Sequence, residues 1–299
     1  MTTIEAVIAA SVEPSVVDVI VNGNESLATE AAGLLARRFF PTDSPTVRIW
    51  STPLGGKAHA WNQYVHLIWP GSRFTFFVDG YARVKDDAFQ LLAAALPAVP
   101  AALAGTGVPS SGTDVVRART ELLSEGGLRG AFFALKKPVM DELRSRNIRL
   151  PLGLYGFDTL LGAILAFGLD PARHAWDVRT HIFVHPDVTW TIEEKKWWRY
   201  AVVKTQWRRK LNNALRALVV QATKRFLSQR KMPPEQLPPT IEQFVLGWIE
   251  ECPQQARQTL AGSPLRRWEV RKLRRPRDWS LAAQAPRLVY ATRESAPQA

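Results

Sequence analysis

The chain has 299 residues, of which 46% are hydrophobic and 22% are charged. This composition allows a buried core in one large domain or two modest ones, and it excludes a disordered chain, a disulfide-rich miniprotein and a collagen-like repeat. The net charge of +12 is uneven: residues 1–194 hold 17 Lys and Arg against 20 Asp and Glu, and residues 195–299 hold 22 against 7. A near-neutral body therefore precedes a strongly basic region, which leaves nucleic-acid, membrane-surface and enzyme classes open.

Cysteine content and the N-terminal sequence indicate a reducing compartment. Cys252 is the single cysteine, so an internal disulfide and a Cys-rich metal site are excluded. Residues 1–15 contain no basic residue, which is not typical of a secretory signal. The uncharged run 88–113 is interrupted by Pro97, Pro100 and Pro109, so we expect a helix, a turn and a buried strand instead of a membrane span.

Helical and strand patterns alternate in the first two thirds of the chain. We expect helices at residues 3–11, 26–39, 56–67, 86–95, 137–145 and 156–167. We expect strands at residues 16–21, 47–50, 74–78, 101–105, 131–135 and 179–184. Ser26 is the expected N-cap of the second helix. Strands separated by helices of about ten residues predict an α/β fold with a buried sheet.

The basic region has a different pattern. Residues 195–231 hold twelve Lys and Arg and no acid, with apolar residues at helical spacing, which predicts a long amphipathic helix or a helix pair. A Pro-rich break at 232–239 precedes a helix at 240–250 with Thr240 as its cap. A second basic cluster at 266–277 holds Trp268, and we expect the last dozen residues to be frayed.

Two segments of the body could bind an anionic ligand. Asp79 directly follows the apolar run 74–78, where a carboxylate can hold a metal on a nucleotide diphosphate or can simply form an Asp-Gly turn. Residues 55–62 (GGKAHAWN) open a helix with two glycines and Lys57, which suits either a phosphate or an ordinary helix start.

Asp158 starts an otherwise apolar helix, where it is either a capping residue or a general base. The histidines are not spaced as metal ligands, and we expect them to be structural or exposed. They are His59, His66, His174, His181 and His185. The sequence contains no Gly-x-Ser-x-Gly motif and no plausible cysteine nucleophile.

The order and spacing of these segments resemble a family 2 glycosyltransferase. The segments are VVDVIVNGNES, GGKAHAWNQ, FTFFVDGYARVKDDAFQLL, RGAFFALKKPVMDEL and GFDTLLGAIL, and the resemblance covers roughly residues 3–195. It implies the GT-A fold, a Rossmann-like three-layer sandwich with a mostly parallel sheet. It also implies transfer of a sugar from a nucleotide-sugar donor with inversion at the anomeric carbon.

The resemblance implies donor-binding roles for five residues. Asn22 stands where the family usually has an Asp that contacts the nucleoside, and Lys57 and Asn62 match its Gly-Lys-x-x-Ala-x-Asn helix. Asp79 matches the first Asp of Asp-x-Asp, and Arg83 stands where the family often carries a basic residue after that motif.

The same resemblance implies a metal and a base. Asp79 would hold a divalent cation, Mn²⁺ or Mg²⁺, but Tyr81 replaces the second Asp, and a phenol is a poor ligand for a hard cation. Asp158 matches the catalytic base, while Phe157 replaces its usual acidic neighbour. The family's first strand, with its Pro-x-x-Asn-Glu-like turn, has no counterpart here.

We therefore expect a catalytic domain at 1–194 and a basic helical region at 195–299 with a frayed tail. The basic residues and aromatics of 195–277 suit an anionic membrane surface, or a helix packed on the body with solvated charges; nucleic acid is less favoured because no binding motif is present. The expected location is the cytoplasm, peripheral on the inner face of the cell membrane, in synthesis of envelope polysaccharide or glycolipid. The alternative is a degenerate relative that binds or regulates without catalysis.

Overall fold

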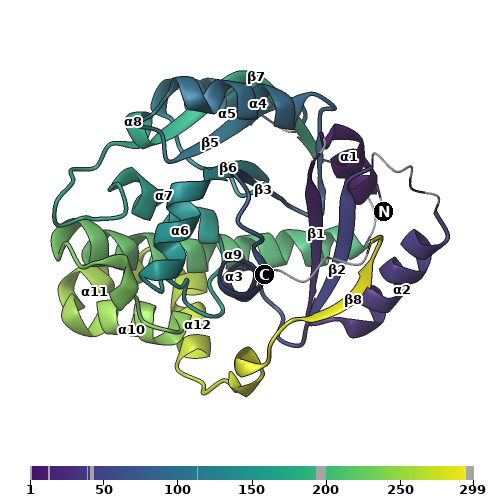
Figure 1. Ribbon diagram of the computed structural model, residues 1–299. Helices are drawn as coiled ribbons and strands as arrows, with labels where there is room; N and C mark the ends of the chain where they lie inside the picture. Colours follow the sequence, from purple (N-terminus) through teal and green to yellow (C-terminus); the bar gives the residue numbers. More distant parts are fainter. Residues whose placement is uncertain are drawn as a thin grey trace.

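The chain forms two β-sheets with helices packed around them, as the computed structural model shows (Figure 1). The structure describes residues 2–12, 14–38, 40, 44–112, 114–192 and 200–293, with the backbone alone at 200–206, 208 and 209. The expected domain boundary at 194 and 195, together with Trp197 and Trp198, lies outside the described residues.

The helices and strands alternate along the first two thirds of the chain, and helices dominate the last third. The strands are β1 (Val16–Asn22), β2 (Thr46–Thr52), β3 (Phe74–Val78), β4 (Ala82–Val84), β5 (Ala104–Pro109), β6 (Phe132–Lys136), β7 (Ile182–Ile192) and β8 (Arg287–Ala291). The helices are α1 (Thr2–Ala10), α2 (Glu25–Ala36), α3 (Lys57–Gln63), α4 (Ala88–Ala95), α5 (Val115–Glu125), α6 (Lys137–Ser145), α7 (Phe157–Ala166), α8 (Val178–His181), α9 (Tyr200–Thr223), α10 (Ile241–Glu251), α11 (Pro253–Ala261) and α12 (Pro264–Leu273). Short turns of π-helix continue α3 (Tyr64–Ile68) and α9 (Lys224–Gln229), and short 3-10 turns lie at Leu96–Ala98, Pro234–Gln236 and Ser280–Ala283.

The α/β class is confirmed, but the expectation of one mostly parallel sheet is wrong. Among the described residues, one sheet has the order β1-β2-β8 and the other the order β3-β6-β5-β7-β4. The pairs β1–β2 and β5–β7 are parallel, whereas β2–β8, β3–β6, β5–β6 and β4–β7 are antiparallel. The sequence pattern could not show this, because an apolar run such as that of β6 specifies a buried strand and not its direction.

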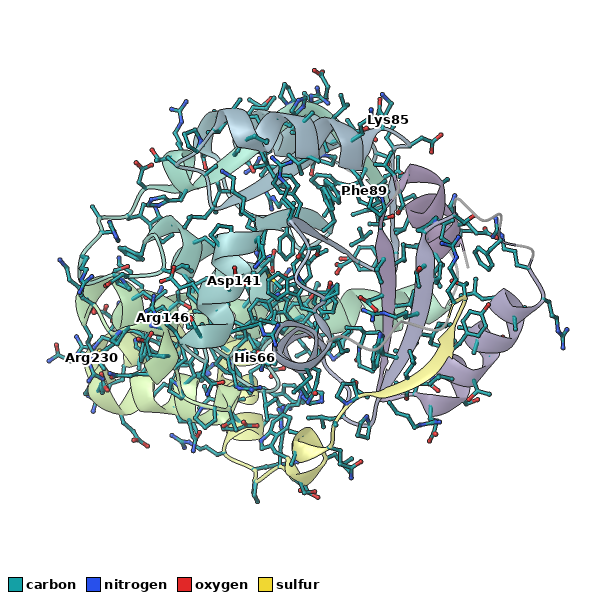
Figure 2. The ribbon with its side chains drawn as sticks, viewed as in Figure 1. His66, Lys85, Phe89, Asp141, Arg146 and Arg230 are labelled. Carbon is teal, nitrogen blue, oxygen red and sulfur yellow. The ribbon has the colours of Figure 1, made fainter. Side chains whose placement is uncertain are left out.

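The larger sheet is the middle of three layers, with α4 and α5 on one face and α6 and α7 on the other. Successive side chains of β6 point to opposite faces of the sheet, so this strand contributes to the apolar core on each face. Phe132 and Ala134 belong to the cluster that includes α4, and Phe133 and Leu135 belong to the cluster that includes α7. Phe89 of α4 points at the sheet, 4.8 Å between ring centroids from Phe76 (Figure 2). Packing on both faces of the sheet fixes the position of the carboxyl end of β3, where the candidate functional site begins.

The smaller sheet packs on α2 through one face and holds a buried ion pair on the other. Val47 and Ile49 are fully buried with Leu35 of α2. On β1 and β2, Asp18 and Arg48 are register partners. The Arg48 guanidinium donates two hydrogen bonds to the Asp18 carboxylate, at 2.7 and 2.8 Å, and the Trp50 indole N–H donates a third, at 2.8 Å.

The C-terminal segment returns to the N-terminal sheet, so the expected frayed tail is partly wrong. Residues 287–291 form β8, which pairs antiparallel with β2, and the Val47 N–H donates to the Thr292 hydroxyl at 3.0 Å. The segment RLVYA is too short to stand out in the sequence pattern, and its partner strand lies more than 200 residues away.

The basic region packs on the body. One apolar cluster joins Leu160 of α7 to Leu218 of α9 and Trp248 of α10. Arg146, at the end of α6, pairs with Glu142 and with Glu235 in the turn before α10, at 2.7 Å each (Figure 2). In the part of the chain that the structure describes, no helix is both long and apolar enough to cross a membrane.

Two expected local features differ and one is confirmed. The N-cap of α2 is Asn24, whose side chain accepts from the Leu27 N–H, and not Ser26. The stretch expected as a strand at 179–184 begins with the short helix α8 before β7. Thr240 caps α10 as expected, with its hydroxyl accepting from the Gln243 N–H.

Candidate functional site

Asp79 is held in a turn at the end of β3. Its N–H donates to the Ala131 carbonyl at 3.0 Å, and its own carbonyl accepts from the Ala82 N–H at 2.8 Å. The Asp79 side chain is only 8% exposed, so its charge must be met by a close partner. That partner is the ammonium of Lys57, which forms an ion pair with the Asp79 carboxylate.

Lys57 is positioned by the loop that joins β2 to α3. Gly56 has φ +129°, a backbone conformation that L side chains rarely adopt, and its N–H donates to the Asn22 side-chain oxygen at 2.8 Å. A Cβ on Gly23 would lie 2.7 Å from the Cα of Gly55, so the carboxyl ends of β1 and β2 touch. The side chain of Asn22 therefore fixes the start of α3, which places Lys57 opposite Asp79.

Aromatic rings surround the Lys57 ammonium. Its Nζ lies 5.4 Å from the ring centroid of Tyr81 and 5.9 Å from that of Phe157, within the range of cation–π attraction. Phe157 is the residue before Asp158, so this contact joins the start of α3 to the start of α7. Lys57 is nevertheless 49% exposed, which leaves its charge open to a ligand.

Tyr81 is influenced by the charges of both candidate carboxylates. Burial raises the pKa of its phenol well above its usual range, and so do the charge of Asp79, a hydrogen bond with Asp79 and the charge of Asp158. The phenol therefore remains protonated at neutral pH. The shared influence on Tyr81 places Asp79 and Asp158 in one electrostatic neighbourhood.

Asp158 lies in the first turn of α7 and does not cap it. The N-cap is Gly156, with φ +69°, so the capping interpretation of Asp158 is wrong. The Asp158 side chain is 14% exposed; its Oδ2 accepts from the Gly130 N–H at 3.4 Å and from Nη2 of Arg216 at 3.5 Å. A Cβ on Gly130 would lie 3.3 Å from the side chain of Asp158, so a glycine at 130 lets the backbone approach the carboxylate.

Arg216 of α9 is a site residue that the sequence pattern did not identify. Its Nε donates to the Thr159 hydroxyl at 2.9 Å, and its Nη2 pairs with Asp158. Arg216 lies 58 residues from Asp158 inside a run rich in Lys and Arg, so its residue type carried no distinguishing signal.

The structure brings together four of the six residues proposed from the resemblance. Lys57 pairs with Asp79 and lies near the ring of Tyr81, Asp79 and Asp158 both act on the ionisation of Tyr81, and Asn22 supports the start of α3. The other two, Asn62 and Arg83, have different surroundings.

Asn62 is 5% exposed, and its side-chain amide is hydrogen-bonded in both directions to the backbone of Leu150, at 2.8 and 2.9 Å. This amide therefore fastens α3 to the segment after α6. Arg83 lies on β4 opposite Thr191 of β7.

The residues around Asp79 do not fit a resident divalent cation. Within the described chain, no group of three or more His, Cys, Asp or Glu is arranged to hold a metal ion. Asp79 is the sole carboxylate of its turn and already pairs with an ammonium, Tyr81 is a neutral phenol, and the Asn22 oxygen accepts from Gly56. A hard cation prefers several charged or carbonyl oxygens, which this set does not offer.

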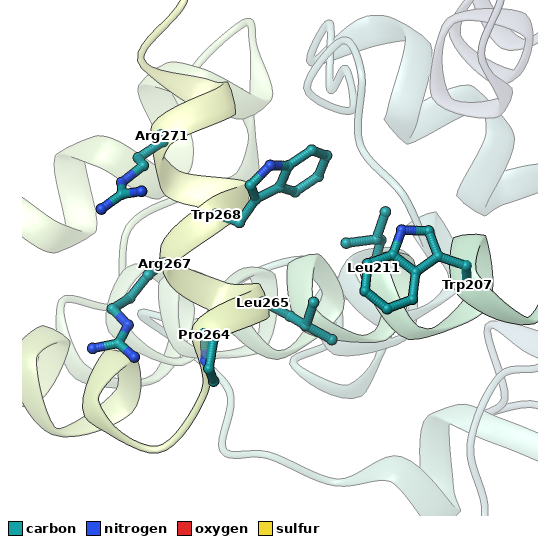
Figure 3. Close-up of a pocket in the computed structure, with 7 residues that line it drawn as sticks. All are labelled: Trp207, Leu211, Pro264, Leu265, Arg267, Trp268 and Arg271. Carbon is teal, nitrogen blue, oxygen red and sulfur yellow. The ribbon is translucent and has the colours of Figure 1, made fainter.

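A second feature is a groove of about 490 Å³ between α9 and α12 (Figure 3). Trp207 and Trp268 line it and are 56% and 46% exposed. The remaining lining residues are Leu211, Pro264, Leu265, Arg267 and Arg271. We call these seven residues the tryptophan groove; its charged side chains are both basic.

No protein-family model and no curated protein sequence matches the chain. A solved structure similar to it is the mannosyltransferase PcManGT from Pyrobaculum calidifontis in complex with GDP-Man and Mn²⁺. The identity is 16%, the match covers 88% of this chain and 86% of that chain, and the TM-score is 0.43. A similarity of this size does not assign an activity.

Proposed function

We propose that the protein transfers a sugar from a nucleotide-sugar donor to an acceptor hydroxyl, as an inverting GT-A enzyme related to family 2. The observation that carries the proposal is the arrangement around Tyr81. A cation–carboxylate pair, Lys57 with Asp79, lies beside a second carboxylate, Asp158, which is held from two sides. The first pair suits the donor diphosphate, and the second carboxylate suits a base.

Asp158 is the base in this proposal. It takes the proton of the acceptor hydroxyl, whose oxygen forms a bond to the anomeric carbon while the bond from that carbon to the phosphate oxygen breaks. The electron pair leaves with the nucleoside diphosphate. The hydrogen bonds from Gly130 and Arg216 hold the Asp158 carboxylate in one orientation, because both converge on Oδ2 and leave Oδ1 for the acceptor.

Asn22 supports the Lys57 loop instead of contacting the nucleoside in this proposal, since its side-chain oxygen already accepts from Gly56. Asn62 is assigned to the frame of the site, since its amide is satisfied by Leu150. Arg83 remains a candidate donor contact. The divalent cation is not part of the mechanism, because the donor set around Asp79 does not fit it.

The Asp158→Asn variant tests this assignment, because it keeps the size of the side chain and removes the base. We expect transfer from a nucleotide-sugar to fall by a factor of about 10²–10⁴, with nucleotide affinity unchanged. Asp141→Asn is the control: Asp141 is an exposed carboxylate paired with Lys137 on α6 (Figure 2). Turnover by Asp158→Asn equal to that of Asp141→Asn contradicts the assignment.

A second candidate function is binding or regulation without catalysis. The observation in its favour is that both carboxylates of the site pair with cations of the chain itself, Asp79 with Lys57 and Asp158 with Arg216. This candidate predicts that nucleotide-sugars bind in calorimetry and are not consumed with any acceptor. Measurable turnover that Asp158→Asn abolishes excludes it.

The proposal includes attachment to an anionic membrane surface through the tryptophan groove, on the cytoplasmic face, with a lipid-linked or envelope acceptor. Exposed tryptophans lie at the headgroup level of bilayers, and each Lys or Arg near an anionic surface adds about 1 kcal/mol. Arg267 and Arg271 line the groove, and the Lys272 ammonium lies 5.5 Å from the ring centroid of Trp268. Positive charge and exposed indole therefore occur on one surface.

Sedimentation with vesicles tests this attachment. We expect the protein to sediment with vesicles of phosphatidylcholine and phosphatidylglycerol at 3:1, and not with phosphatidylcholine alone. Replacing Trp207 and Trp268 together by Ala lowers the bound fraction at least fivefold, whereas Trp176→Ala, at a tryptophan 55% exposed on the loop before α8, leaves it unchanged. Equal sedimentation of both variants, or salt-steep binding of duplex DNA in place of vesicles, contradicts it.

A further inference from the structure

Lys57 is an unusual lysine for its exposure. A half-exposed lysine normally samples many rotamers in water, and surface ion pairs restrain it weakly. The Lys57 ammonium is instead held at one place by a carboxylate that is 8% exposed and by two aromatic rings. The charge is therefore preorganised, while 49% of the Lys57 side chain stays exposed.

The Asp79–Lys57 pair has the same net charge as a metal site that holds two carboxylates and one dication. Two carboxylates with one dication sum to zero, and so do one carboxylate and one ammonium. Tyr81 occupies the position of the second carboxylate, and its phenol is neutral because its pKa is raised by burial and by the charge of Asp79. The Lys57 Nζ lies 5.4 Å from the centroid of the Tyr81 ring. An aromatic ring at this position suits an ammonium, whereas a metal ion would need an oxygen ligand there.

A dication would have to displace Lys57. A metal bound to Asp79 would lie beside an ammonium that already contacts the same carboxylate, and two like charges at contact distance repel. Asp158 does not supply the missing oxygen, because its Oδ2 already accepts from Arg216 and the Gly130 N–H, and in the proposed function its Oδ1 receives the acceptor hydroxyl.

We propose that the Lys57 ammonium, held by Asp79 and by the rings of Tyr81 and Phe157, neutralises the donor diphosphate in place of a divalent cation. This inference rests on the proposed function. An ammonium donates hydrogen bonds to phosphate oxygens as a compact point charge. It also stabilises the negative charge that the leaving nucleoside diphosphate acquires when the bond to the sugar breaks.

Calorimetry with GDP and UDP tests the inference, in 1 mM EDTA and again in 1 mM Mn²⁺. We expect at least one of the two nucleotides to bind the unmodified protein. Its affinity in EDTA should lie within threefold of its affinity in Mn²⁺. Lys57→Met lowers the affinity at least tenfold in EDTA, and Lys57→Arg retains most of it. Lys85→Met is the matched control, because Lys85 is an exposed lysine paired with Asp87 at 2.9 Å (Figure 2).

A gain-of-metal variant keeps the test decisive if Lys57→Met fails to fold. Tyr81→Asp supplies the second carboxylate, and we expect the protein with bound nucleotide then to deplete the free Mn²⁺ signal in electron paramagnetic resonance, which the unmodified protein does not. Nucleotide binding that requires Mn²⁺ in the unmodified protein overturns the inference and leaves the proposed function standing. Failure of both nucleotides to bind in either buffer overturns the proposed function and this inference with it.

Discussion

Removal of Asp18 should destabilise the protein more than removal of any surface carboxylate. Asp18 is 3% exposed at its side chain and accepts hydrogen bonds from Arg48, 9% exposed, and from Trp50. Asp18→Ala leaves the guanidinium buried and uncompensated and the indole N–H without an acceptor. Breaking a buried pair in this way costs about 3–5 kcal/mol, a large part of a total stability of about 5–15 kcal/mol.

Urea denaturation measures this loss as a lower free energy of unfolding. The control is Glu121→Ala, whose partner Arg117 is 80% exposed; we expect it to cost less than about 1 kcal/mol. The double variant Asp18→Leu with Arg48→Met removes both charges and should recover most of the loss. The reasoning is refuted if Asp18→Ala costs under about 1 kcal/mol, or if the double variant is as unstable as the single one.

Three further predictions concern stability. Burial lowers the pKa of His59 below its usual value of about 6.5, so the unfolded chain takes up the proton at a higher pH than the folded protein. The free energy of unfolding therefore falls as the pH drops below about 6.5, by at most about 1.4 kcal/mol per pH unit. His59→Gln should flatten this dependence in urea titrations between pH 7.5 and 5.5, and an unchanged slope counts against the prediction. Thr240→Ala removes the cap on the Gln243 N–H and should cost about 0.5–2 kcal/mol by chemical denaturation, with no loss arguing against a cap. Gly107→Ala places a Cβ 2.1 Å from the backbone oxygen of Val188 and should prevent soluble expression or sharply lower the thermal midpoint; a variant as stable as the parent contradicts the close approach of β5 to β7.

The sequence predicted the candidate site residues that stand where one kind of segment gives way to another, such as the end of an apolar run or the start of a helix. Asp79 follows an apolar run, and Lys57 follows two glycines at the start of a helix, so each stands out as a polar residue where the sequence pattern changes. The structure adds that the two form an ion pair. Periodicity alone does not give that contact, because it does not fix the distance between the ends of two elements.

Long-range pairings were not visible in the sequence. Arg216 reaches Asp158 across 58 residues, and the Asn62 amide reaches Leu150 across 88. A basic run does not show which of its members is turned toward the body, and an Asn in a helix looks the same whether it binds a ligand or a backbone. The pairing of β8 with β2 is a long-range pairing of the same kind, because a short run does not show which distant strand it pairs with.

The most direct test of the central claim is hydrogen exchange with and without GDP-linked and UDP-linked sugars. The account predicts slower exchange at Gly55–Asn62 and at Asp79–Arg83 when the preferred donor binds, because Lys57 and Asp79 face the diphosphate. The tryptophan groove should keep its exchange rates. Protection confined to other segments, or no protection by any donor at saturating concentration, would contradict the claim that this cluster is a nucleotide-sugar site.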